Sequence, residues 1–100
     1  MTQATTPTFT LTVPNEVDLT QAAHIYFTLI QGANIISKSD TDLTVTAHSV
    51  EVFLTQAETL PFKAGKAALQ LNWTYPDGSR ACSNIASVSI TANLLKVVVV

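Results

Sequence analysis

The sequence alternates apolar and hydroxyl-bearing residues with a period of two, in short segments that end at turn residues. Phe9, Leu11 and Val13 alternate with threonines, and the stretch from Ala86 to Leu94 alternates most regularly of all. Successive side chains of a strand point to opposite faces, so this period is typical of strands with one buried face. The chain is therefore expected to form antiparallel sheets, each with one apolar face to cover.

The composition supports strands and excludes several other classes of protein. Threonine occurs 15 times, valine 10 times and isoleucine 6 times in the 100 residues, and these β-branched residues favour strands. Charged residues make up only 12%, against a usual ~25%. Together with 47% hydrophobic residues this excludes a disordered chain, and a net charge of −2 provides no basic field for a nucleic acid.

No membrane partner and no secretory signal are expected. No stretch reaches the roughly 20 consecutive apolar residues that a membrane-spanning helix needs. The first residues, MTQATTPTF, contain neither a basic region nor an apolar region of the kind that a signal peptide has. We therefore expect synthesis in the cytoplasm.

Turn signals divide the chain into about seven expected strands. The strongest is Pro76-Asp77-Gly78-Ser79, because proline presets φ for a turn and glycine supplies a positive φ. Asp18 and the capping-box pattern Thr55-x-x-Glu58 each predict one helical turn. The expected strands cover residues 8–13, 23–31, 35–36, 43–47, 50–54, 65–75 and 86–94.

Seven short strands in a single domain, residues 1–100, favour two sheets packed face to face. We therefore predict an all-β fold, an immunoglobulin-like antiparallel β-sandwich of about seven strands. A small β-barrel with the same number of strands is the alternative.

The sequence contains no recognisable catalytic, cofactor or metal site. A zinc site needs three or four ligands at defined spacing, and His24 and His48 are the only histidines. The single cysteine, Cys82, lacks the base and orienting group that a nucleophile requires. Asp40 and Asp42 flank a turn, where aspartate is expected for its backbone hydrogen bonds. We expect a protein that is not an enzyme and that has no cofactor.

Three aromatic residues are candidates for an interaction surface. Tyr26, Trp73 and Tyr75 are the only rings that could form a platform for a sugar or anchor a protein partner. Trp73 falls on the inward side of its expected strand, so a core position is the competing interpretation.

The end of the chain is the second candidate for an interaction site. Val97, Val98, Val99 and Val100 form an apolar run after Lys96. Such a run could pair with a partner by strand addition, or it could continue the last strand into the core. Few charged residues protect the expected sheet edges, which is compatible with edges that neighbouring subunits cover.

The order of these motifs resembles a known family of small β-sandwich domains. Val17-Asp18-Leu19-Thr20 precedes an Ile/Tyr/Phe/Thr strand, and Trp73-Thr74-Tyr75-Pro76-Asp77-Gly78 precedes the final strand. Over about residues 5–95 the chain is similar to the N-terminal domain of the baseplate upper proteins of bacteriophages that infect Gram-positive bacteria. Those domains usually precede a larger C-terminal part, whereas this sequence stops after the sandwich.

The resemblance implies a structural protein of a phage or prophage particle, of the tail or baseplate type. It implies assembly with other virion proteins, formation of a homo-oligomer and location in the virion, with neither enzymatic activity nor a cofactor. The alternative is a carbohydrate-binding adhesion module of such a particle, whose ligand is a host surface glycan.

Overall fold

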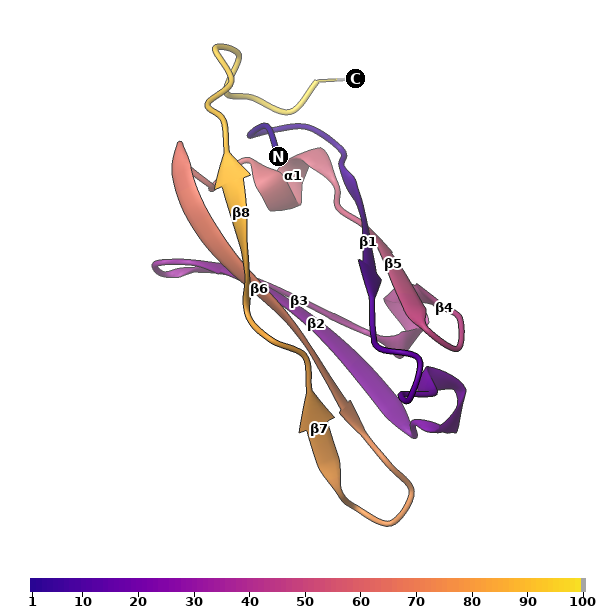
Figure 1. Cartoon of the computed structure of the whole chain (residues 1–100). Coiled ribbons are helices and arrows are strands. Elements are labelled where there is room, and N and C mark those ends of the chain that lie inside the picture. The colour runs from indigo at the N-terminus through magenta and orange to yellow at the C-terminus, as the bar shows by residue number, and fades with distance from the viewer. Residues whose placement is uncertain (100) are drawn as a thin grey trace.

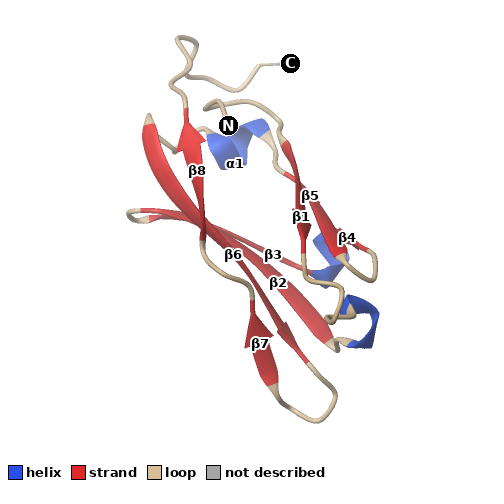
Figure 2. Cartoon of the chain, viewed as in Figure 1, coloured by secondary structure: helices blue, strands red, loops and turns tan. Residues whose placement is uncertain are grey.

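Two antiparallel sheets packed face to face form the structure, a computed structural model in which residues 1–99 are described (Figures 1 and 2). The smaller sheet has the strand order β1-β5-β4, and the larger has the order β3-β2-β6-β7, with β8 also pairing with β6. No named strand of one sheet pairs with a strand of the other, so the all-β sandwich is confirmed and the barrel is not formed. The strands are β1 (Thr8–Thr12), β2 (His24–Gln31), β3 (Asn34–Ser39), β4 (Leu43–Val45), β5 (Ser49–Phe53), β6 (Gly65–Thr74), β7 (Arg80–Cys82) and β8 (Ala86–Ile90).

Three short helical turns connect the sheets: η1 (Leu19–Gln21), η2 (Asp40–Asp42) and α1 (Gln56–Thr59). Both predicted caps are present. The carboxylate of Asp18 accepts a hydrogen bond from the backbone N–H of Thr20, and Thr55 and Glu58 form the reciprocal capping box. These caps satisfy amides that would otherwise lack partners at the start of each turn.

The core lies between the sheets and consists of the inward-facing residues of the predicted alternation. In β6 every second residue from Ala67 to Trp73 is buried, and in β2 the buried residues are Ile25, Phe27 and Leu29. The rings of Phe9 and Phe27 lie 6.2 Å apart and join the two sheets. The residues that form one connected buried cluster are Val13, Leu19, Ile25, Phe27, Leu29, Ile36, Val50, Val52, Leu54, Phe62, Ala67, Leu69, Leu71, Trp73 and Ile90.

The last predicted strand begins at Ala86 as expected, but its end and the strand that precedes it differ from the prediction. β8 ends at Ile90, whereas the alternation predicted a strand to Leu94, and the short strand β7 was not predicted. Ile90 pairs with Gly65, the first residue of β6, so the ladder has no partner strand beyond this point. Alternation in sequence therefore continues further than the hydrogen bonding that defines a strand.

β7 and β8 lie one after the other along the same edge of β6. β8 pairs with residues 65–69 of β6, and β7 pairs with residues 72–74. Between them, the hydroxyl of Ser83 accepts a hydrogen bond from the N–H of Leu71 at 3.0 Å, and the N–H of Ser83 donates to the Leu71 carbonyl at 2.9 Å. The Ser83 side chain thus replaces one rung of the ladder where the edge strand is interrupted.

Candidate functional site

The two sheets differ in width, and this difference leaves one side of the sandwich open. The smaller sheet is three strands wide. The larger is one strand wider, because β7 and β8 share a single position beside β6. No strand of the smaller sheet therefore faces the β7–β8 position. Neighbouring strands are spaced about 4.8 Å apart, so one additional strand beside β1 would cover the β7–β8 position.

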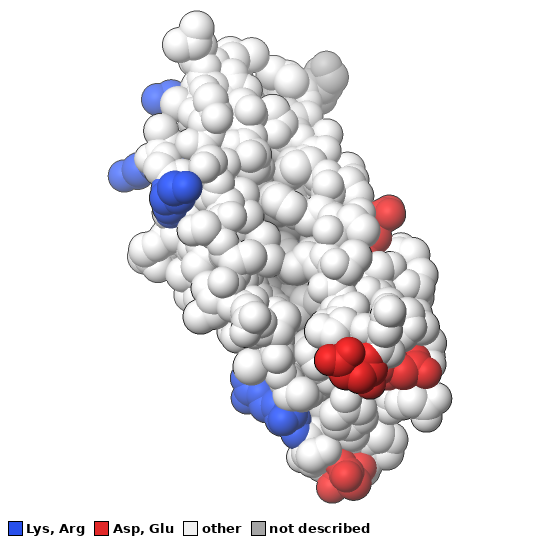
Figure 3. All heavy atoms as spheres, in the orientation of Figure 1, with Lys and Arg blue, Asp and Glu red and all other residues white. Residues whose placement is uncertain are grey.

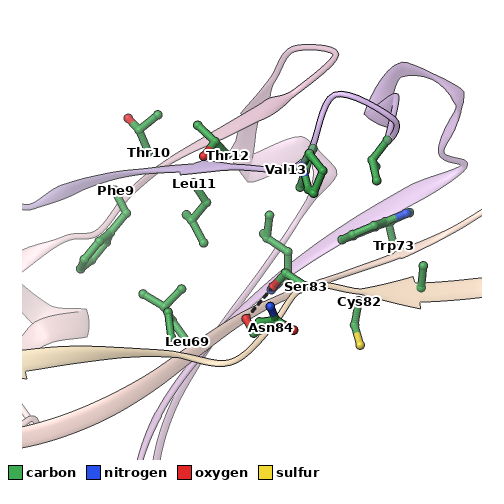
Figure 4. Close-up of a pocket in the computed structure, with 15 residues that line it drawn as sticks. Phe9, Thr10, Leu11, Thr12, Val13, Leu69, Trp73, Cys82, Ser83 and Asn84 are labelled. Carbon is green, nitrogen blue, oxygen red and sulfur yellow. Dashed lines mark hydrogen bonds between the residues drawn. The ribbon is translucent and has the colours of Figure 1, made fainter.

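An apolar groove of about 660 Å³ occupies this open side (Figure 4). The side chains of Phe9 and Leu11 point from β1 into the groove, towards Leu69 on its opposite wall (Figure 4). Charged side chains lie towards the margins of this face of the molecule, and its centre carries none (Figure 3). The lining residues are Phe9, Thr10, Leu11, Thr12, Val13, Pro14, Val17, Leu69, Leu71, Trp73, Ala81, Cys82, Ser83, Asn84 and Ala86.

The backbone of β1 borders the groove with an unpaired edge. The N–H of Leu54 donates to the Pro7 carbonyl, and the N–H of Val13 donates to the His48 carbonyl. These two bonds show which residues of β1 bond to β5, because residues that bond to the partner strand alternate with residues that do not in an antiparallel pair. The N–H and C=O groups of the intervening Thr8, Thr10 and Thr12 consequently point away from β5, and no strand among residues 1–99 pairs with that edge.

The edge of β8, on the other side of the groove, is partly covered by the N-terminus. The α-amino group of Met1 donates to the Ser89 carbonyl at 2.8 Å, and the Thr91 N–H donates to the Met1 carbonyl at 2.8 Å. The Gln3 N–H then donates to the Thr91 carbonyl at 2.9 Å. From there the N-terminal segment crosses to β1 (Figure 1). Of the two edges that flank the groove, β1 is therefore the one that can accept a new strand along its length.

The C-terminal valines lie outside both sheets. Val97, Val98 and Val99 are 54%, 52% and 47% exposed, and Leu95 is 56% exposed. The interpretation that the last strand continues into the core is therefore wrong for these residues. Val100 lies outside the described residues. An exposed apolar segment of this kind is unusual in a monomeric protein and points to an interaction.

The candidate aromatic residues do not form a common platform. Trp73 is only 3% exposed, and its indole N–H donates to the Tyr75 hydroxyl at 3.0 Å. Tyr26 pairs with Asn72, the neighbour of Trp73, so Tyr26 lies on the outer face of the sheet and Trp73 on the inner face. The core position of Trp73 is therefore confirmed, and an exposed platform that includes this ring is excluded, because the inward alternation of β6 places it in the core.

The histidines and the cysteine lie apart from one another and serve local contacts. The Nδ1–H of His24 donates to the Asp40 carboxylate at 3.1 Å, and the Nδ1–H of His48 donates to the Val17 carbonyl at 2.7 Å. Cys82 is exposed, and its sulfur points away from the groove (Figure 4). Within residues 1–99 no three His, Cys, Asp or Glu side chains are grouped closely enough to hold a metal ion.

Glu58 makes the least exposed ion pair of the described chain. Its carboxylate lies 2.6 Å from the Lys38 ammonium, which links α1 to β3. Burial by itself raises the pKa of the Glu58 carboxyl, but hydrogen bonds from Lys38 and the Thr55 N–H outweigh it and lower the pKa below its usual value. Hydrogen bonds from the hydroxyl and N–H of Thr20 likewise lower the pKa of Asp18.

A lowered native pKa predicts stability that is lost in acid. The native state binds protons more weakly than the unfolded state, so the contribution is complete above the ordinary carboxyl pKa and disappears as the pH falls through the native pKa. We expect Tm, followed by circular dichroism, to decrease between pH 6 and pH 3. Glu58→Gln should reduce the slope of this decrease, and an unchanged slope would contradict the contribution of the ion pair.

Sequence reasoning identified one half of the candidate site and missed the other. The C-terminal valines were visible as an apolar run. The groove was not, because it results from a difference in width between two sheets. Threonines without Lys or Pro along residues 8–12 were the available sign of an unprotected strand edge.

The fold and the site together define an all-β sandwich in which β1 has an unpaired edge beside an apolar groove. Comparison with protein-family models, curated proteins and solved structures gave no match. No helix among residues 1–99 is long and apolar enough to cross a membrane.

Proposed function

We propose that this chain is a non-enzymatic structural protein of a bacteriophage or prophage particle. In this role it is incorporated into the virion as a tail- or baseplate-type assembly module. It docks through its sheet edges and loops onto other virion proteins and further copies of itself.

The unpaired edge of β1 beside the apolar groove is the observation that carries this proposal. Proteins that remain monomeric protect their edge strands with charges, prolines or bulges. β1 has none of these between Thr8 and Thr12, and the groove extends the exposed edge with apolar surface. Such an arrangement is best stabilised by another protein surface, as in an assembled particle.

The assignment to phage particles is supported by the resemblance of the sequence to baseplate upper protein domains. The segments that carry this resemblance have structural functions in the fold. Val17–Thr20 contains the cap of η1, and Tyr75–Gly78 forms the turn after β6, closed by a 2.9 Å hydrogen bond from the Gly78 N–H to the Tyr75 carbonyl. A sugar-binding module gains no comparable support, because Trp73 is buried.

Two measurements test the proposal. In size-exclusion chromatography with light scattering, we expect the full chain to form assemblies whose mass increases with protein concentration. In particles purified from a bacterium that carries the gene, mass spectrometry should detect the chain in many copies per particle. A strictly monomeric chain that is absent from purified particles would overturn the proposal.

A further inference from the structure

We propose that the C-terminal segment Leu95–Val99 of a second copy inserts into the groove as an additional strand, antiparallel to β1. This inference rests on the proposed assembly function and specifies its partner, its contact surface and its orientation. Strand addition of this kind takes its affinity from main-chain hydrogen bonds and its specificity from pockets for alternate side chains.

The segment matches the groove in length and in pattern. β1 has five residues, and so does Leu95–Val99. In a strand, Leu95, Val97 and Val99 would share one face, with Lys96 and Val98 on the other. The first face is wholly apolar and fits the apolar groove, while the second keeps the lysine in solvent.

The charges at the end of the groove favour the antiparallel orientation. Pairing Val97 with Leu11 places Lys96 beside Thr12, at the end where β1 leads into the loop before η1. Glu16 and Asp18 are both exposed in that loop. Hydrogen bonds to Thr20 lower the pKa of Asp18 and keep its carboxylate ionised. A lysine that enters at this end therefore meets negative charge.

A chain cannot readily place its own tail in this way. The tail leaves β8 at the end of the sandwich where the N-terminus and α1 lie (Figure 1). From there it would run parallel to β1, and the N-terminal residues already occupy the β8 edge at Ser89 and Thr91. Asn93 is also held there, because its side chain donates to the Gln3 carbonyl at 3.1 Å. The tail of another copy, entering from the η1 end, avoids both obstacles.

In the isolated chain, the side chain of Gln56 forms two hydrogen bonds with the backbone of Val99. Its Nε2–H donates to the Val99 carbonyl at 2.8 Å, and its Oε1 accepts from the Val99 N–H at 2.9 Å. Both bonds are exposed to solvent, so water replaces them at little cost when the tail is released. Because the tail leaves one molecule at the α1 end and enters the next at the η1 end, the contact is head-to-tail and generates rings or filaments.

Two adjacent substitutions in the full chain test the inference. Val97→Asp places a carboxylate on the groove face, whereas Val98→Asp places the same group on the solvent face. We expect Val97→Asp to raise the dissociation constant of self-association at least about tenfold, because a buried unpaired charge is strongly unfavourable. The matched control Val98→Asp should change it less than about threefold, since its charge stays in water. Analytical ultracentrifugation measures the dissociation constant of each variant. If the two substitutions weaken self-association equally, the assignment of Val97 to the groove face and Val98 to the solvent face is wrong.

Cysteine cross-linking identifies which copy supplies the strand. In a Cys82→Ser background, Thr10→Cys and Val98→Cys become opposite neighbours in the proposed pairing. Mild oxidation with oxidised glutathione should then link separate chains into dimers and longer ladders on a non-reducing gel. Thr44→Cys with Val98→Cys is the control, because Thr44 lies in β4 at the other side of the same sheet. Disulfides formed only within one chain would contradict insertion from a second copy.

The outcomes separate this inference from the proposed function. If the wild-type chain assembles and both aspartate variants assemble equally well, strand insertion is wrong while assembly stands. If the wild-type chain is monomeric at all concentrations, strand insertion between copies is wrong, and the presence or absence of the chain in purified particles then decides the proposed function.

Discussion

Replacement of Trp73 with alanine is expected to lower the free energy of unfolding by about 3–5 kcal/mol, the usual cost of truncating a buried tryptophan. Trp73 is 3% exposed, packs in the core and also lines the groove. A domain of this size has a total stability of about 5–15 kcal/mol, so the variant should be close to unfolding at 37 °C. Urea denaturation followed by circular dichroism measures the change.

The matched control for this prediction is Tyr75→Phe, which keeps the ring and removes only the hydroxyl that accepts the indole N–H. The loss of this hydrogen bond should cost about 1 kcal/mol. A Trp73→Ala variant that loses less stability than the control would show that the indole is not part of the core. The same result would restore the case for an exposed sugar-binding ring.

Replacement of Thr10 with proline is expected to abolish self-association while leaving the sandwich folded. The N–H of Thr10 points away from β5, so proline removes no hydrogen bond of the β1–β5 ladder. Proline is tolerated on an edge strand when its position faces solvent. It nevertheless removes a donor that an incoming strand needs, and its ring obstructs the approach. We expect the dissociation constant of self-association to rise at least about tenfold.

Thr10→Val is the control for the proline variant, because it also removes the hydroxyl but keeps the N–H and the strand propensity. It should assemble as the wild type does. Thermal unfolding must show both variants to be folded. A folded Thr10→Pro variant that assembles normally would exclude the β1 edge as the interface.

The fold was predictable where the sequence pattern depends on local geometry. Alternation placed Ile25, Phe27 and Leu29 on one face of β2, which the structure buries, and the short-range hydrogen bonds of Asp18 and Thr55 marked two helical turns. These features depend on residues a few positions apart. The end of β8 and the existence of β7 were not predictable in this way, because a strand ends where its partner ends, and the partner is distant in sequence.

The candidate site was also predictable only in part. The sequence by itself determined an all-β chain with inward and outward faces and an apolar C-terminal run, because period-two alternation and composition are properties of neighbouring residues. Only the tertiary structure decided that the valines are exposed and that β1 keeps an open edge. The physical reason is that exposure depends on which strands the opposite sheet contains, and long-range pairing alone sets the number of strands on each side.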